Sequence, residues 1–153
     1  RDGLIKITIK SYSSGNLQGG IFREQNAFYV RATLTPGVIM DMDHFSYHDD
    51  DVFIASSGST RVPYFESVEF SDEDQEELLL TGGDILDAHA EREFRGEYNL
   101  RISLFENGPF WRSNWVSSEV IPFDNIGETS KTYGISARSG ASATFSIKKV
   151  RKD

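Results

Sequence analysis

The chain has 153 residues, with 38% hydrophobic and 26% charged, which is the size and composition of one folded domain rather than of a disordered polymer. Acidic residues outnumber basic ones by 24 to 16, and the net charge of -8 disfavours unaided binding to nucleic acid or to an anionic lipid surface. The absence of cysteine excludes disulfides, thiolate metal sites and cysteine nucleophiles.

The chain begins at Arg1 without an initiator methionine and carries no signal-peptide pattern. We therefore expect residues 1–153 to form a single domain excised from a larger protein. The lack of cysteine fits a cytoplasmic host, with association to a membrane or to the cytoskeleton left open. No apolar run approaches the roughly 20 residues that cross a bilayer, so attachment to a membrane would be peripheral.

Two strands are predicted near the start of the chain. In residues 4–10, isoleucines alternate with lysine and threonine, which is typical of a strand with one face in the core. Residues 11–26 are rich in Ser, Gly, Asn and Gln and indicate a long loop. The alternation returns in residues 27–35, and the positions expected to face the core are Phe28, Val30, Ala32 and Leu34.

The next part of the chain predicts further strands. Residues 38–47 alternate, an acidic cluster at 49–51 follows, and residues 52–55 look like a returning strand. Residues 56–63 are interpreted as a loop. Residues 64–70 alternate again, with either Tyr64 or Phe65 facing inward.

The segment 71–95 is the exception to this β pattern. Ser71, followed by three acidic residues, is a good helix start, because a hydroxyl caps free amide groups and acids suit the positive end of the helix dipole. The pattern predicts a short helix that ends at Thr81 and two glycines, and a second helical piece over 84–93. We expect a helical insertion here.

The most informative stretch is EYNLRISLFENGPFWRSNW, residues 97–115. Its first half alternates as a strand, and Asn107, Gly108 and Pro109 then form a turn. Three more strands are predicted at 116–123, 132–136 and 142–150. About eight short strands and one helical excursion predict an antiparallel β-sandwich.

The order of these elements resembles a C2 domain. GLIKITIKSY and NAFYVRATLTPG look like the opening strand and the SDPYV stretch of that family, with Tyr29 and Val30 in the matching place. LRISLFENG looks like its L-x-V-x-V-x-D-x-D strand and third loop, and KTYGISARSGASATFSIKKV is similar to its closing hairpin. The resemblance covers most of the chain and implies an eight-stranded sandwich whose loops at one end meet membranes.

The resemblance also implies that calcium binding is weak. Calcium-binding members hold the ion with aspartates in loops one and three, since calcium takes six to eight oxygen ligands. Here the position two before Tyr29 is Ala27, and the two loop-three aspartates correspond to Glu106 and Gly108. The oxygen ligands that remain near these positions make a weak calcium site at most: Glu24, Asn26, Glu106 and Asn107.

Large aromatics follow the turn of the third loop. If Phe110 and Trp111 project, they form an apolar wedge for a bilayer interface or a pocket of a partner, and Arg112 beside them can meet a phosphate or an acidic group. If they fold back, they close the end of the sandwich, which is the role we expect for Trp115. Phe110, Trp111 and Arg112 are the candidate docking loop.

Other sites find less support. The stretch MDMDHFSYHDDD holds enough histidine and carboxylate for a metal site, but strand alternation separates neighbours, and an acidic edge that discourages aggregation is the favoured interpretation. The same stretch is acidic where phosphoinositide-binding members need lysines. No G-x-S-x-G elbow or phosphate-binding glycine loop is present, so we expect no enzyme.

The sequence therefore predicts a noncatalytic, calcium-independent C2-like docking module, a scaffold that binds a partner protein or another domain of its host, or attaches peripherally to a membrane. The net charge and the acidic segments favour protein slightly. Two alternatives stay open. One is a calcium-dependent phospholipid-binding domain that inserts Phe110 and Trp111, and the other is a carbohydrate-binding sandwich with Trp111 and Trp115 as sugar platforms.

Overall fold

A computed structural model describes residues 3–19, 23–36, 51–90, 98–108 and 112–151. Within these residues the chain forms ten strands, one α-helix and one 3-10 turn, and the predicted all-β antiparallel sandwich is confirmed. The elements are β1 (Gly3–Ser13), β2 (Gln25–Pro36), β3 (Val52–Ser56), β4 (Thr60–Pro63), β5 (Ser67–Glu69), β6 (Glu76–Thr81), α1 (Gly82–Ala90), β7 (Tyr98–Asn107), β8 (Ser113–Pro122), η3 (Phe123–Asn125), β9 (Lys131–Ser136) and β10 (Ser142–Arg151).

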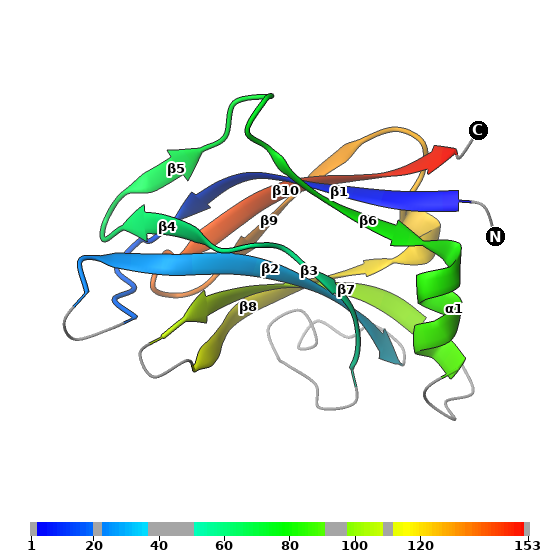
Figure 1. The fold of residues 1–153 in the computed structure, drawn as a ribbon, viewed down its shortest axis with the longest axis horizontal. Coiled ribbons are helices and arrows are strands. Elements are labelled where there is room, and N and C mark those ends of the chain that lie inside the picture. Colours follow the sequence, from blue (N-terminus) through cyan, green and yellow to red (C-terminus); the bar gives the residue numbers. More distant parts are fainter. Residues whose placement is uncertain (1–2, 20–22, 37–50, 91–97, 109–111, 152–153) are drawn as a thin grey trace.

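Two sheets pack face to face (Figure 1). In the first, here called the β1 sheet, the order is β5-β1-β10-β9, with β6 also paired to β1. In the second, the β2 sheet, the order is β3-β2-β7-β8, with β4 also paired to β2. The inner faces of both sheets form one main hydrophobic core, which includes fully buried Ile7, Phe28, Leu104 and Phe145. All the strand pairings are antiparallel.

Strand β1 begins as predicted and then changes phase. Ile5, Ile7 and Ile9 face the core, but the pairing with β10 shifts between Ile9 and Ser11. A bulge of one residue moves the following side chains to the other face. Tyr12, which the predicted loop 11–26 included, is therefore 1% exposed and stacks on a core phenylalanine.

The insertion between β5 and α1 corrects one prediction. The helix expected to begin at Ser71 is wrong, because Glu76–Thr81 is a strand that pairs with β1. Leu78 and Leu80 enter the core while Leu79 is 51% exposed, a period-two pattern that three consecutive leucines conceal. The pairing with β1 therefore takes precedence over the capping signal at Ser71.

The second helical prediction is confirmed in α1, although its start is reversed. Thr81 and the two glycines were expected to end a helix, whereas Thr81 caps the beginning of one. The amide of Asp84 donates to Thr81 Oγ1 at 2.9 Å, and the amide of Thr81 donates to Asp84 Oδ2 at 3.1 Å. This reciprocal capping box satisfies two amides that the helix itself leaves free.

Three other predictions meet the structure differently. The expected loop 56–63 contains β4, and the expected strand 64–70 is reduced to β5, with Phe65 exposed rather than inward. The expected strand 38–47 lies outside the described residues. The returning strand is confirmed as β3, and the three late strands are confirmed as β8, β9 and β10.

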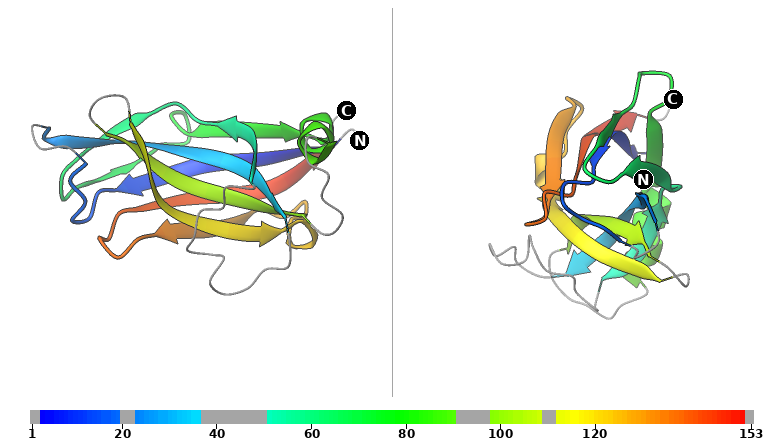
Figure 2. Two further views of the ribbon diagram at one scale, coloured as in Figure 1. Left: turned by 90° about the horizontal axis from the view of Figure 1, so that it is seen from below. Right: turned by 90° about the vertical axis from the view of Figure 1, so that its left-hand side faces the viewer.

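The two ends of the sandwich differ. Figure 1 shows both termini and α1 at the right-hand end, and Figure 2 shows the same separation from below. The opposite end carries the β1–β2, β4–β5, β7–β8 and β9–β10 connections, and we call it the loop end. The residues predicted from the resemblance to lie near calcium or to dock belong to this end.

Candidate functional site

Asn26 and Glu106 lie on neighbouring strands at the loop end, but both side chains are buried. The side-chain oxygen of Asn26 accepts the amide of Gly19 at 2.8 Å, and its nitrogen donates to Ser14 Oγ at 3.0 Å and to the Leu17 carbonyl at 2.8 Å. Asn26 therefore fastens the β1–β2 connection to the sheet. Its oxygen is already occupied by a protein donor.

Glu106 is 2% exposed and holds several segments together. Its burial raises the pKa of this carboxyl, an effect that hydrogen bonds from the Ala27 amide and the Asn114 side chain and the charge of Arg23 partly offset. One oxygen, Oε1, is buried without a hydrogen bond. A Cβ built on Gly19 would come within 2.3 Å of the Glu106 carboxyl carbon, so the β1–β2 connection lies directly against this group.

Arg23 joins the first and third loops. Its Nη1 donates to the carbonyl oxygen of Asn107 at 3.1 Å. The Asn107 side chain is fixed in turn, because its nitrogen donates to Ser59 Oγ at 2.8 Å and its oxygen accepts from Ser113 Oγ at 3.2 Å. An arginine and an asparagine with both polar atoms engaged thus occupy the position where the resemblance implied a weak calcium site.

The four residues predicted for that site are only partly brought together. Asn26, Glu106 and Asn107 lie at the ends of β2 and β7. Glu24 is exposed, and its carbonyl oxygen accepts the amide of Tyr64 at 3.1 Å. Among the described residues, no group of three or more His, Cys, Asp or Glu is arranged to hold a metal ion.

An open groove of about 1130 Å³ runs beside these residues on the loop end. It crosses the ends of β4, β2 and β7 and carries Arg23, Arg61 and Glu24 as the charged residues of its described lining. Arg61 is exposed, and no described residue forms a hydrogen bond or ion pair with its side chain. Ala27 and Ser59 also line the groove.

The predicted docking loop is described only in part. Phe110 and Trp111 lie outside the described residues, so their expected projection stays a prediction. Arg112 is exposed, and its carbonyl oxygen accepts the amide of Gly108 at 2.6 Å, which closes the β7–β8 turn. Trp115 lies on β8, half-buried, and its Nε1 donates to Ser118 Oγ at 2.8 Å.

Phe65 is a loop-end residue that the sequence placed in the core. It lies at the tip of the β4–β5 connection, is 66% exposed and has φ +65°. A bulky non-glycine residue in this left-handed region is strained, and it gains no burial in return. The hydrogen bonds of the turn hold the conformation, because the Glu66 amide donates to the Pro63 carbonyl and the Ser14 amide to the Glu66 carbonyl.

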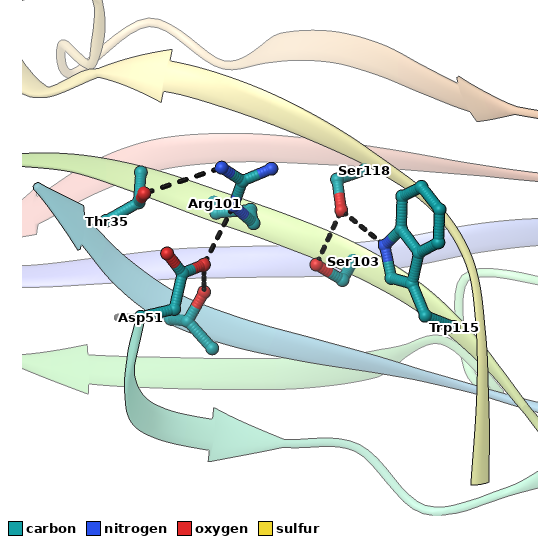
Figure 3. A network of polar contacts seen from close by, with 7 residues as sticks. Thr35, Asp51, Arg101, Ser103, Trp115 and Ser118 are labelled. Carbon is teal, nitrogen blue, oxygen red and sulfur yellow. Dashed lines mark hydrogen bonds and ion pairs between the residues drawn. The ribbon is translucent and has the colours of Figure 1, made fainter. Parts of the chain in front are cut away.

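A second polar region lies at the middle of the outer face of the β2 sheet (Figure 3). Arg101, which is 0% exposed, places its Nε 2.7 Å from Asp51 Oδ2, and the same oxygen accepts from Thr33 Oγ1 at 2.9 Å. Beside this pair, Ser118 Oγ is shared by Ser103 and Trp115. This network is closed and buried, unlike the loop end.

The comparisons with known proteins follow the fold. No protein-family model matches the chain, and no curated protein matches it. The chain is similar over 99% of its length to the first listed C2 domain, domain A, of a plant extended synaptotagmin 1; the match covers 97% of that domain, with a TM-score of 0.55 and 10% identity. The chain folds as a C2-like domain.

A second solved structure, of CC2D1B, is similar over 97% of this chain and 55% of that one, with a TM-score of 0.48 and 11% identity. At this level of identity the comparisons establish the fold and leave the site residues to the chain's own geometry. In the part of the chain that the structure describes, no helix is long and apolar enough to cross a membrane.

Proposed function

We propose that this C2-like domain is a noncatalytic docking module of a larger protein, and that its loop end attaches to a partner protein without calcium. The observation that carries the proposal is Phe65, an aromatic side chain held in solvent at φ +65° on the loop end. Exposed large aromatics that a rigid turn presents are typical anchors of protein interfaces.

The strain at Phe65 is the main reason to assign it a function. A phenylalanine at a left-handed position costs about 1–2 kcal/mol relative to glycine. Its exposed ring offsets none of this cost, and residues in such conformations cluster at binding sites. The predicted docking loop, Phe110 to Arg112, belongs to the same end and would extend the apolar surface.

Calcium independence is supported by Arg23. Calcium needs six to eight oxygen ligands, preferably from clustered carboxylates. At the loop end the guanidinium of Arg23 is bonded to the Asn107 carbonyl and acts electrostatically on Glu106, and the Asn26 oxygen accepts a backbone amide. A fixed positive charge next to the buried carboxylate of Glu106 opposes the entry of a second cation.

Protein is favoured over membrane as the target on electrostatic grounds. The chain carries a net charge of -8, and Glu24 and Glu66 lie beside the arginines of the loop end. A bilayer with anionic lipids presents a broad negative potential that repels such a molecule at long range. A protein partner can place its charges only where the loop end is positive.

Site-specific photo-cross-linking tests this proposal. We would replace Phe65 with a photoreactive phenylalanine in the full-length host protein, and place the same group at Leu79 as a control, since Leu79 is 51% exposed on the outer face of the β1 sheet. The expected result is a discrete protein adduct from position 65, formed equally in calcium and in chelator, and none from position 79. Adducts with lipid alone, or equal adducts from both positions, would contradict the proposal.

Vesicle co-sedimentation addresses the calcium-dependent alternative. We expect the same small pelleted fraction with phosphatidylcholine vesicles and with vesicles that also contain phosphatidylserine, in calcium and in chelator. If calcium increases pelleting of the anionic vesicles and Glu106→Gln removes the increase, the domain is a calcium-dependent phospholipid binder instead.

A further inference from the structure

We propose that the loop-end groove binds the phosphate group of a phosphorylated side chain in an extended segment of the partner protein. This rests on the proposed function, because it names the chemistry that the docking surface recognises. The groove is the feature of the described loop end that combines a cavity with unpaired positive charge. Arg61 is the principal residue.

The floor of the groove is a small side chain between larger ones. Ala27 on β2 pairs with Arg61 on β4, and it lies one position before Phe28, which pairs with Glu106 on β7. The row across the three strand ends therefore runs from Arg61 through Ala27 toward Asn107. A methyl group at the centre leaves the space between the two longer side chains open.

Arginine makes this space positive. Arg23 and Arg61 line it against one carboxylate, Glu24, so the described lining has a net positive charge although the chain as a whole is at -8. Arg61 has no hydrogen-bonding or ion-pair partner among the described residues. An arginine fork binds phosphate oxygens through paired N–H groups, which gives both strength and orientation.

The wall opposite Arg61 is held in place before any ligand binds. The Asn107 side chain is fixed by Ser59 and Ser113, and its carbonyl oxygen accepts from Arg23. Arg23 therefore approaches the groove in a set orientation. Preorganised groups lose less conformational entropy on binding than mobile ones, so a compact anion gains more from this wall than from free surface arginines.

Charge and shape together favour a phosphorylated peptide. A phosphoserine or phosphothreonine carries about two negative charges at one point, which suits two arginines around one hollow better than a single carboxylate does. The overall negative charge of the chain and Glu24 on the lining oppose a continuous anionic lipid surface. β4, which pairs only with β2 among the described strands, leaves an edge where an extended segment can lie.

The experiment is an NMR titration of the domain with two probes. The first is inorganic phosphate, and the second is an acetylated, amidated Gly-Gly-phosphoserine-Gly-Gly peptide, with its serine form as a control. We expect both probes to shift the amide signals of Ala27 and Arg61, and the serine peptide to shift neither. Arg61→Ala should weaken the phosphopeptide by about tenfold or more, as the loss of a charge-assisted hydrogen-bonding group predicts.

Two further variants control the interpretation. Ala27→Asp places a carboxylate on the floor and should also abolish the shifts, while Arg138→Ala removes an exposed arginine of the loop end that does not line the groove and should leave them unchanged. Shifts that are absent in the native domain, or that Arg61→Ala and Arg138→Ala reduce equally, would overturn the proposal. Each variant's spectrum reports whether it remains folded.

A third arm uses vesicles that contain phosphatidylserine. If they bind in an Arg61-dependent manner while the phosphopeptide does not bind, the groove is a lipid site and the proposal is wrong. Failure of the proposed function is separate, because it appears as missing protein cross-links from position 65 while the phosphate shifts persist. Failure of the groove appears as missing shifts while those cross-links remain.

Discussion

Two polar regions occupy the outer face of the β2 sheet, and they use arginine in opposite ways. In the middle of the sheet, Arg101 is fully buried and paired with Asp51 at 2.7 Å. At the loop end, Arg61 is exposed beside an open groove and has no described partner. The difference separates an arginine that holds the fold together from one that is free to bind something else.

The largest expected effect is loss of the buried pair. Arg101→Met leaves the Asp51 carboxylate buried without its cation, which costs about 3–5 kcal/mol of unfolding free energy. Urea denaturation measures it, with Arg61→Met as the matched control at about 0.5 kcal/mol or less. Equal losses in the two variants would remove the distinction between the two arginines.

The close packing of the first loop comes next. In Gly19→Ala, the new methyl group would lie 2.3 Å from the Glu106 carboxyl carbon, and the loop must shift at a cost of about 1–3 kcal/mol. Gly108→Ala should cost less, because its methyl group meets the side chain of exposed Asn114, which can move. A harmless Gly19→Ala would mean that the loop does not rest on Glu106.

A smaller effect is expected in the central network. Trp115→Phe removes the donor to Ser118 Oγ but leaves the Ser103–Ser118 hydrogen bond, so about 1 kcal/mol should be lost. Thermal unfolding of the variant measures this loss. An unchanged midpoint would place Trp115 outside the network.

The pH dependence of Glu106 tests the loop end without removing a contact. Its pKa is raised above the ordinary 4.5, so the folded state binds the proton more tightly than the unfolded state does. The unfolding free energy of the native chain should therefore fall, relative to Glu106→Gln, as pH rises from 4.5 through the folded-state pKa. A difference between the two proteins that does not change with pH would contradict the burial of this carboxyl.

The sequence predicts the sandwich well where one physical rule acts alone. Strict alternation identified β2 and the inward face of β1, and the ordered strand signals were sufficient for the C2-like resemblance. The same alternation failed at Tyr12, because a bulge changes the phase and leaves no mark in composition. It also failed at Leu78 to Leu80, where the pairing with β1 decides the structure.

The candidate site was predicted less completely. Glu106 and Asn107 were identified by resemblance, but nothing local indicates that Arg23 would bond to Asn107 or that Asn26 would be buried, since both depend on contacts between distant loops. Phe65 was placed in the core because its hydrophobicity fits a strand. Its positive φ arises from the hydrogen bonds of the β4–β5 turn, and a sequence pattern contains no signal for that conformation.

The most direct test of loop-end docking changes Phe65 and measures stability and attachment together. Phe65→Gly removes an exposed ring and relieves a left-handed position, so the unfolding free energy should stay the same or rise by about 1 kcal/mol. In the full-length host with a photoreactive group at Arg138, the same substitution should reduce the protein cross-link to background. Cross-linking at the native level, or a loss accompanied by clear destabilisation, would contradict the assignment of Phe65 as a docking residue.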